Sequence, residues 1–421
     1  MTNPISAGPS KKDLHSVYAF GIFSMALIDI FVLLIPIFAK ESLGMSDGEI
    51  GTLVGARSIL SLFLSIHGGA LMDRYGTRRI TLMFTGAVVI CGPIFPLLST
   101  FWALLVLQAI SGFAISLGWS GAQTLIARIA DGDAEYIGRF STFARIGTTI
   151  APIFAGLLFD IGGAWLAYGF GTVWAACAFY ALWRTPEPNP RSRVKNAVEN
   201  PKFRLSDIMP KVSDYRASFA LMAIPAVAFT AVAMLVRNST YNLQTSIYVT
   251  YSYDAGLTAT KIGLLFAAIE MAGAFGSWYS GRAMRKFDPI NFLVLTTFVT
   301  VSLIAATPLI GGMGEGAWAI FGCLLIGQVI RGYMQGVSQP ILFSVQAISV
   351  TKEQQGIVVG LRQTMNRFGG IVIPPIAGFT SDFYGREESF YIVGGGLLFI
   401  LLCLAVYGHF VPRIATPSKS D

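Results

Sequence analysis

The sequence predicts an all-α membrane protein with twelve transmembrane helices arranged as two similar halves. Of its 421 residues, 54% are hydrophobic and only 13% are charged, and the mean hydropathy is +0.62. Average soluble domains carry roughly 25% charged residues, and a soluble globule could not bury this much apolar surface. The other two observations are a series of apolar segments of membrane-spanning length and an internal repeat. Together they exclude a soluble globular fold.

Twelve apolar segments are long enough to cross a bilayer, because a spanning helix needs about 20 mostly apolar residues. The runs are continuous, which favours helices over the alternating strands of a β-barrel. The long polar stretch 184–215 is expected to link an N-terminal six-helix bundle, 1–183, to a C-terminal one, 216–421. The expected spans lie near 17–39, 48–72, 79–98, 101–127, 140–160, 164–183, 217–250, 259–281, 289–311, 316–346, 355–380 and 389–412.

The basic residues predict how the chain is oriented. With the N-terminus in the cytoplasm, 21 of the 30 Lys and Arg residues lie on the cytoplasmic side, and Lys40, Lys261 and Arg386 lie outside. The positive-inside rule therefore predicts an integral plasma (inner) membrane protein with both termini in the cytoplasm. The net charge of +7 then reflects topology and attraction to anionic lipid head groups. The lipid bilayer is an expected partner, and nucleic acid is not.

The two halves of the chain repeat each other. Placing residues 138–163 on 360–385 makes nine positions identical. At slightly different offsets, Gln108 to Gly112 matches Gln328 to Gly332, and Ile50-Gly51 matches Ile262-Gly263. Parallel repeats related by an axis along the membrane normal are typical of a transporter with its site between the halves. The nine identical pairs are Gly138/Gly360, Thr142/Thr364, Arg145/Arg367, Gly147/Gly369, Pro152/Pro374, Ala155/Ala377, Gly156/Gly378, Asp160/Asp382 and Gly163/Gly385.

A charged glycine-rich loop follows the second segment and reads Gly69-Ala-Leu-Met-Asp73-Arg74-Tyr75-Gly76-Thr77-Arg78-Arg79. It resembles the signature loop of the major facilitator superfamily, G-x3-D-R-x-G-x-R-R, with every defining position filled. Asp73 can accept hydrogen bonds from a neighbouring helix N-terminus, where the helix dipole favours an anion. The resemblance implies the twelve-helix major facilitator fold, alternating access, and a conformational latch formed by Gly69, Asp73, Arg74, Gly76, Arg78 and Arg79. The alternative is a charged loop that only fixes topology.

The fifth segment is similar to the antiporter motif of twelve-span drug–proton exchangers, G-x8-G-x3-G-P-x2-G-G. Gly138, Gly147, Pro152 and Gly156 occupy motif positions, whereas Ala151 and Ala155 replace two of its glycines. Small residues and a proline favour close helix packing and a bend, so this segment and its counterpart with Gly369, Pro374 and Gly378 are expected to pack closely and gate the cavity. Generic helix packing is the alternative. Gln108 stands where those exchangers carry an arginine, so their proton relay is not transferred to this chain.

Charged residues inside the predicted spans point to a binding cavity, because a charge buried in a membrane is costly unless it is paired or functional. Asp29 and Glu270 can neutralise at most two of the six arginines. A guanidinium suits a carboxylate or phosphate, so the excess predicts a cavity that receives an anionic solute. Arg331 is the first candidate for substrate binding, followed by Arg57, Arg237 and Arg367. The intramembrane arginines are Arg57, Arg145, Arg237, Arg331, Arg362 and Arg367, of which Arg145, Arg362 and Arg367 could instead bond to carbonyls or reach the interface.

Asp29 and Glu270 are also the candidate proton carriers, because a carboxyl group in an apolar cavity can load and release a proton as access alternates. A fixed salt bridge with an arginine is the competing role. Further candidates for substrate binding are the polar Tyr241, Asn242, Gln335 and Asn366, with Trp119 as an apolar wall. Helix–helix hydrogen bonding is the alternative for each polar side chain.

The predicted function is therefore secondary active transport of a small organic, anionic solute by alternating access with proton coupling. The alternative is a proton-coupled multidrug efflux antiporter for amphipathic compounds. No metal-ligand set, nucleophile elbow or phosphate loop is present in the sequence, so we expect neither enzymatic activity nor a cofactor or metal site. The expected partners are the solute, protons and the bilayer, and the expected state is a monomer.

Overall fold

A computed structural model describes residues 10–131, 133–187, 219–351 and 355–409 of the chain. These residues form helices and no strand, which confirms the predicted all-α class. Most of the expected linker lies outside the described residues. The N-terminal half contains α1 (Lys11–Glu41), α2 (Asp47–Ala56), α3 (Ile59–Tyr75), α4 (Thr77–Cys91), the 3₁₀ helix η1 (Gly92–Leu97), α5 (Phe101–Ile129) and α6 (Ala134–Arg184).

The C-terminal half repeats this pattern. It contains the short 3₁₀ helix η4 (Leu221–Ala223), α8 (Pro225–Gln244), α9 (Ile247–Asp254), α10 (Ala259–Lys286), α11 (Pro289–Ala305), α12 (Thr307–Gly312), α13 (Ala317–Ile348), α14 (Gln355–Tyr384) and α15 (Arg386–Gly408). The described part of each of the twelve expected spans is largely helical, and the fifth and sixth spans lie in the single helix α6.

Several spans are broken rather than continuous. Seven described helical segments are long and apolar enough to cross a membrane on their own, and one of them, Glu135–Arg184, covers two expected spans. Its halves meet at Gly162 and Gly163, where Gly163 takes φ 65° and ψ −160°. The second, seventh and ninth spans are the pairs α2/α3, α8/α9 and α11/α12. Arg57 and Ser58 occupy the break between α2 and α3.

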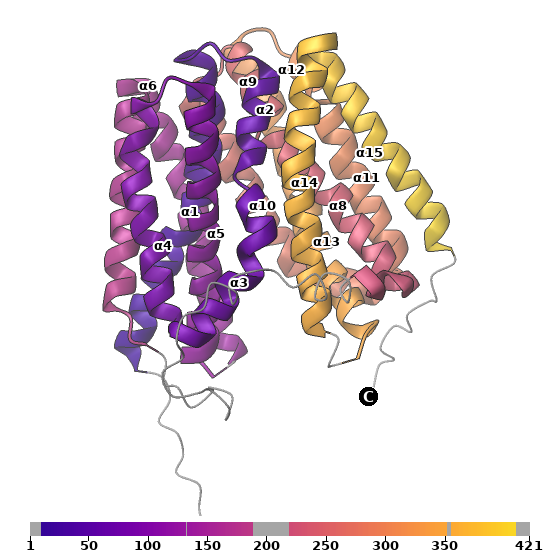
Figure 1. The fold of residues 1–421 in the computed structure, drawn as a ribbon. Helices are drawn as coiled ribbons and strands as arrows, with labels where there is room; N and C mark the ends of the chain where they lie inside the picture. Colours follow the sequence, from indigo (N-terminus) through magenta and orange to yellow (C-terminus); the bar gives the residue numbers. More distant parts are fainter. Residues whose placement is uncertain (1–9, 132, 188–218, 352–354, 410–421) are drawn as a thin grey trace, which may run out of the picture.

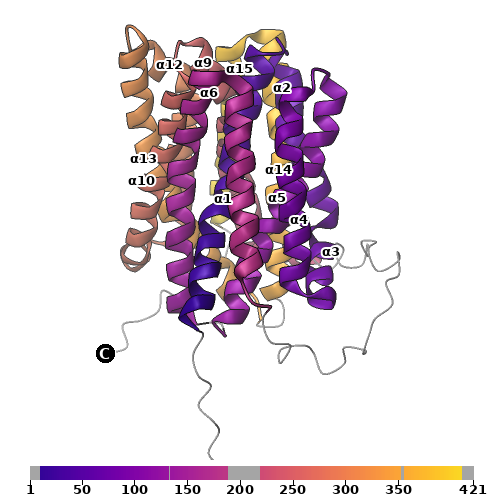
Figure 2. The ribbon, with the colours of Figure 1, turned by 90° about the vertical axis from the view of Figure 1, so that its left-hand side faces the viewer.

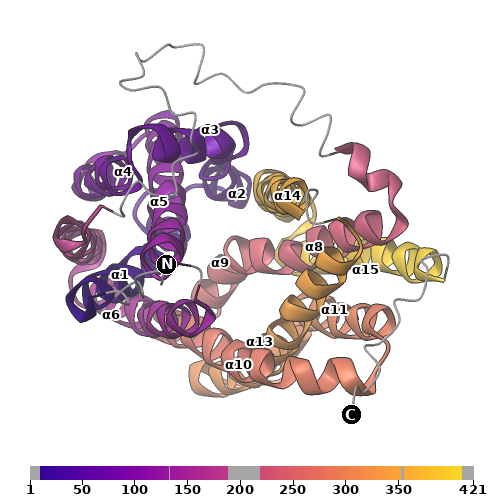
Figure 3. The same ribbon diagram turned by 90° about the horizontal axis from the view of Figure 1, so that it is seen from below.

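The helices form two bundles that run along the same axis (Figures 1 and 2). Helices α1–α6 make the first bundle and α8–α15 the second, and the view along the axis separates them (Figure 3). We call the end at which α1 begins and α15 ends the terminal end, and the opposite end the distal end (Figure 1).

Two seams hold the bundles together, one between α2 and α14 and the other between α6 and α10. A Cβ atom on Gly51 would collide with the carbonyl oxygen of Pro374, and one on Gly263 would collide with that of Pro152. Gly378 and Gly156 approach the carbonyl oxygens of Asp47 and Ala259 equally closely. These contacts are related by the sequence repeat, so the two seams are pseudo-symmetric copies of each other.

The remaining glycines of the expected packing motif differ in their surroundings. Gly147 packs against the backbone of Ile22 within the first bundle, and Gly369 approaches the Leu235 side chain of α8. Gly138 has no atom within 4 Å of a Cβ placed on it. The expectation of close packing at Gly138 is therefore corrected, because this position near the start of α6 faces open space.

Candidate functional site: two cavities between the bundles

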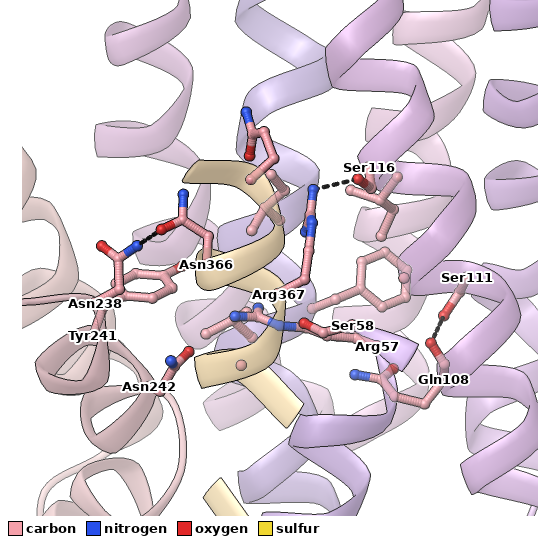
Figure 4. Close-up of a pocket in the computed structure, with 17 residues that line it drawn as sticks. Arg57, Ser58, Gln108, Ser111, Ser116, Asn238, Tyr241, Asn242, Asn366 and Arg367 are labelled. Carbon is pink, nitrogen blue, oxygen red and sulfur yellow. Dashed lines mark hydrogen bonds between the residues drawn. The ribbon is translucent and has the colours of Figure 1, made fainter. Parts of the chain in front are cut away.

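Two cavities lie where the bundles meet. The larger, which we call the central cavity, has a volume of about 270 Å³ and draws its lining from α1, α5, α8, α14 and the α2/α3 break (Figure 4). The smaller, the side cavity, has a volume of about 200 Å³ and is lined mainly from α6, α8, α10 and α13. Asn238 and Tyr241 line both cavities and therefore form the wall between them.

Two arginines reach the central cavity from opposite bundles. Arg57 comes from the α2/α3 break, which packs against Gly112 of α5. A Cβ on Gly112 would lie 2.5 Å from the Arg57 Cα, so this close approach requires a glycine. Arg367 comes from α14, and its Nη2 donates a hydrogen bond to Ser116 Oγ at 2.5 Å (Figure 4). Arg57 Nη1 and Arg367 Nε are buried without a hydrogen-bond partner. None of the residues that line this cavity carries a carboxylate, so its walls favour an anion.

Polar uncharged groups complete the central cavity. Asn238 Nδ2 donates a hydrogen bond to Asn366 Oδ1 (Figure 4), and Asn242 Nδ2 is buried without a partner. The guanidinium of Arg57 lies 5.8 Å from the centroid of the Tyr241 ring. The amide groups of Asn238, Asn242 and Asn366 thus line the same cavity as the two guanidinium groups, and polar groups of this kind orient a polar solute.

Both intramembrane acids lie between the bundles, next to the cavities. Arg145 Nη1 of α6 lies 3.4 Å from Glu270 Oε2 of α10, and both residues line the side cavity. Asp29 of α1 is 7% exposed and accepts a long hydrogen bond, 3.5 Å, from the Tyr241 hydroxyl of α8. Each carboxylate therefore contacts a side chain of the opposite bundle.

Arg237 faces the side cavity but is bound by its own bundle. Its Nε donates to Ser338 Oγ at 3.1 Å, and its Nη2 donates to the carbonyl oxygen of Gln335 at 3.1 Å. Gln335 lines the same cavity and donates from Nε2 to Thr240 Oγ1 at 2.7 Å. These bonds fix α8 against α13 and leave fewer donors of Arg237 free than of Arg57.

Three of the residues discussed from the sequence lie elsewhere. Arg331 is 1% exposed and lines neither cavity, because it points into the second bundle, where its Nη2 donates to Gln244 Oε1. Trp119 also lines neither cavity and instead stacks on Phe140 with ring centroids 5.7 Å apart. Arg362 lies over the Phe343 ring at 4.0 Å. The choice of Arg331 and Trp119 as lining residues is corrected on this geometry.

The distal end carries two further sites that the sequence reasoning left without a role. The Asp382 carboxylate accepts hydrogen bonds from the backbone nitrogens of Asp47 at 3.0 Å and Gly48 at 2.9 Å. The Asp160 carboxylate accepts from those of Ala259 at 2.8 Å and Thr260 at 2.9 Å. Each aspartate thus binds the N-terminus of a helix in the opposite bundle, where the helix dipole favours a negative charge. Asp160 and Asp382 are an identical pair in the sequence repeat, and this identity was the signal in the sequence that could have singled them out.

Among the described residues, the seam between α2 and α14 alone adds a network of paired charges at this end. Arg386 donates from Nε to Asp47 Oδ2 at 2.7 Å and from Nη2 to Oδ1 at 3.0 Å, and Nη1 pairs with Asp254. Burial of Asp47 favours its neutral form, but hydrogen bonds from Arg386 and Ser381 outweigh burial and lower the pKa of Asp47 below its ordinary value of 3.8. The same partners raise the pKa of Arg386. Both groups are therefore charged at neutral pH.

Hydrogen bonds hold the signature loop against the first bundle at the terminal end. Gly76 takes φ +101°, which allows the tight turn between α3 and α4. Arg78 donates from Nη2 to the carbonyl oxygen of Trp183 at 2.5 Å and from its backbone nitrogen to Glu187 at 3.3 Å. The side chain of Asp73 lies outside the described residues, and its expected contact with a neighbouring helix stays a prediction.

The chain is similar to transporters in both sequence and structure. Residues 17–374 match the profile of the Major Facilitator Superfamily. The chain is 25% identical over 386 residues to the enterobactin exporter EntS of Salmonella typhi, covering 88% of this chain and 86% of that protein. It is 21% identical over 407 residues to the quinolone resistance protein NorA of Staphylococcus aureus (strain MRSA252), covering 94% and 97%.

Two solved structures show the same fold. The nucleoside transporter NupG superposes with a TM-score of 0.73 at 12% identity, over 94% of this chain and 98% of that one. The human organic anion transporter MFSD10 (TETRAN) superposes with a TM-score of 0.61 at 16% identity, over 94% and 100%. With its all-α architecture and its match across most of its length, the chain belongs to the major facilitator superfamily and is a membrane transporter rather than an enzyme.

Proposed function

We propose that this transporter exports a small organic solute that carries an anionic group, and that it couples export to protons by alternating access. The observation that carries the proposal is the central cavity, where Arg57 and Arg367 face one space from opposite bundles and no lining residue is a carboxylate. A bound carboxylate or phosphate could accept hydrogen bonds from both guanidinium groups. Such a solute would contact both bundles at once, as alternating access requires.

The direction of transport rests on the relatives. One relative is named an exporter of enterobactin, and another is named a quinolone resistance protein. The second name supports the alternative function, proton-coupled efflux of amphipathic drugs. Apolar lining from Ile28, Phe31 and Val32 would suit the apolar part of either kind of solute.

The orientation follows from the basic loops. The positive-inside rule puts the terminal end on the cytoplasmic side of the inner (plasma) membrane. The distal end, where both seams are closed, then faces outward. In this arrangement a solute would enter from the cytoplasmic side, and release would require the two seams to open.

Proton coupling is supported by the two acids that contact the opposite bundle. A proton on Glu270 removes the charge that attracts Arg145, so the α6/α10 seam loses an ion pair inside the membrane. The Arg145 and Glu270 side chains are 35% and 28% exposed where they line the side cavity, so a proton can reach Glu270 through that space. Asp29 loses its role as a charged acceptor for Tyr241 in the same way. Protonation would therefore weaken contacts between the bundles.

The arginine pair is tested by transport in proteoliposomes with an imposed pH gradient. Arg367→Gln is compared with Arg362→Gln, a matched change five positions away on α14, where the guanidinium contacts Phe343 instead of the cavity. We expect transport of organic anions to fall about tenfold to a hundredfold in Arg367→Gln, the range for losing a charged hydrogen bond of about 1.5–3 kcal/mol. Arg362→Gln should transport anions at close to the wild-type rate.

The same assay separates the two candidate functions. An anion transporter should lose activity in Arg367→Gln and should discriminate against lipophilic cations of similar size. A drug exporter should prefer the lipophilic cations and keep that transport in Arg367→Gln. Unchanged anion transport in Arg367→Gln would contradict the proposed substrate class.

A further inference from the structure

The outer side of α10 carries a stripe of exposed side chains that is apolar over most of its length and basic at its end. Met271, Phe275 and Trp278 are 52%, 61% and 76% exposed. The exposed Arg282 and Arg285 follow, and the Arg282 guanidinium lies 5.9 Å from the Trp278 ring centroid. Spacings of three or four residues put all five on one side of the helix. The other sides of α10 pack on α6 and α13, so the stripe faces away from the protein.

The basic end of this stripe consists of Arg282, Arg285 and Lys286, and the described protein does not neutralise it. None of the three forms an ion pair with a described carboxylate. The acid that follows them, Asp288, instead accepts a hydrogen bond from the backbone nitrogen of Asn291 at 2.9 Å. Like charges three and four residues apart repel each other on a helix surface. An anion beside these side chains would therefore stabilise this end of α10.

The corresponding element of the first bundle has a different charge pattern. Residues 69–74 of the signature loop correspond to residues 281–286 in the sequence repeat. Arg285 stands in place of Asp73, and Arg282 stands in place of an alanine. The second loop therefore cannot make the carboxylate contact that is expected of the first. Its basic end is not a second copy of the latch and requires another explanation.

The stripe has the length of one leaflet of a bilayer. At about 1.5 Å per residue, Met271 and Arg282 lie about 16 Å apart along the helix axis, and half of a hydrocarbon core of about 30 Å is about 15 Å. Trp278 would then lie near the membrane interface, where tryptophan is favoured. An acyl chain that packs along Met271 and Phe275 would bring its phosphate level with Arg282 and Arg285.

We propose that this stripe binds one anionic phospholipid from the leaflet at the terminal end. The phosphate contacts Arg282, Arg285 and Lys286, and an acyl chain lies along the apolar part of the stripe. A zwitterionic lipid carries an ammonium group that the three cations repel, so the site selects an anionic head group. The proposal does not depend on the transported solute. Because α10 also carries Glu270, the lipid would hold one helix of the α6/α10 seam at the membrane surface.

The first test titrates the purified full chain in detergent with phosphatidylglycerol or with phosphatidylcholine of the same acyl chains, and counts bound lipids by native mass spectrometry. We expect wild type to bind one phosphatidylglycerol about tenfold more tightly than phosphatidylcholine. The double variant Arg282→Gln/Arg285→Gln should lose this preference. The control Lys11→Gln/Lys12→Gln removes the same charge from the exposed start of α1, at the same end, and should keep it.

Two results of this titration would overturn the proposal. Equal affinities of wild type for the two lipids would show that the stripe does not select an anionic head group. An equal loss of preference in both double variants would show a general attraction of the basic surface to anionic lipid rather than a site on α10.

The second test separates a lipid site from a site for free anions and leaves every charge in place. Sodium phosphate should displace bound phosphatidylglycerol no more than sodium chloride of the same ionic strength does. Trp278→Ala should weaken phosphatidylglycerol binding about threefold. Trp318→Ala, at an equally exposed tryptophan near the start of α13, should not. Specific displacement by phosphate, or unchanged binding in Trp278→Ala, would contradict a lipid site on this stripe.

Discussion

The seam between α2 and α14 and the seam between α6 and α10 share one backbone pattern but carry their charges at different depths. In both, an aspartate binds the helix N-terminus of the opposite bundle, and a glycine lies against a carbonyl oxygen. The α2/α14 seam adds Arg386 and Asp47 at the distal surface. The α6/α10 seam instead has Arg145 and Glu270 farther along the helices, beside the side cavity.

This difference bears on which of the two seams can respond to protonation. At the distal end the Asp47 and Arg386 side chains are 6% and 18% exposed and share two hydrogen bonds, and the lowered pKa of Asp47 keeps it ionised at neutral pH. The Arg145 and Glu270 side chains are 35% and 28% exposed, line the side cavity and meet at a single contact of 3.4 Å, so a proton can reach Glu270 and a gained proton removes the pair. The repeat thus supplies two similar closures, and we infer that only the α6/α10 closure reports protonation of the transport pathway.

The largest expected effect comes from removing the acid of the α6/α10 seam. Glu270→Gln should abolish substrate-driven proton flux in proteoliposomes, to the level of protein-free liposomes, because the amide cannot carry a proton through the cycle. Asp29→Asn tests the second candidate carrier in the same assay. Glu135→Gln is the control, because Glu135 is an exposed residue of α6 whose partner is Arg139. Wild-type coupling in both Glu270→Gln and Asp29→Asn would refute the assignment of proton carriers.

The next effect concerns the glycines that both seams share. Gly378→Ala and Gly156→Ala each place a Cβ against a backbone oxygen of the opposite bundle. Overpacking of this kind costs about 1–3 kcal/mol. The ratio of the closed to the open population should therefore fall about fivefold to a hundredfold. Spin-label distances across the distal end measure it. Gly396→Ala, where nothing lies within 4 Å, should leave the distances unchanged, and similar distances in all three variants would contradict the packing argument.

A smaller effect distinguishes the two aspartates. Asn in place of Asp160 or Asp382 keeps an acceptor but loses the charge at the helix N-terminus, a change worth about 0.5–1 kcal/mol. Asp382→Asn should open its seam less than Asp160→Asn opens the other, because Arg386 and Asp47 still join α15 to α2. The same distance measurement applies. A larger opening in Asp382→Asn would show that the charge network adds no support.

The smallest effect is the acid sensitivity of the distal network. Because the pKa of Asp47 is lowered in the closed seam, the ionised form favours closure, and this contribution is present above the ordinary pKa of 3.8 and is lost as the pH falls through the lowered value. Closure of the α2/α14 seam should therefore be constant between pH 7 and about pH 5. Arg386→Gln removes the hydrogen bonds to Asp47 and should move the loss to higher pH. A wild-type seam that opens between pH 7 and pH 5 would contradict this assignment.

Much of the fold was predictable, because membrane length and apolar composition leave few alternatives to helices. The repeat also indicated which residues would be structurally equivalent, as the matching contacts of Gly51 with Pro374 and Gly263 with Pro152 show. The break at Arg57 was not predicted, since it lies inside an otherwise continuous segment.

The site was predictable only in part. Arg57, Arg367, Tyr241, Asn242 and Asn366 were chosen from the sequence and line the central cavity. Arg331 was the first choice, yet it lies apart from Gln335, although the two are four residues apart on one helix face. Neighbours of α13 on either side decide which space each side chain reaches, and the spacing of residues along one helix does not contain that information.

The most direct test of the central inference is the distance across the distal ends of α6 and α10, measured with spin labels at pH 7 and pH 5 in wild type and in Glu270→Gln. Wild type should open this seam as the pH falls. Because the amide mimics a protonated carboxyl, Glu270→Gln should be open at both pH values, with no change at the α2/α14 seam. A Glu270→Gln seam that is as closed as wild type and shows the same pH response would contradict proton sensing by Glu270.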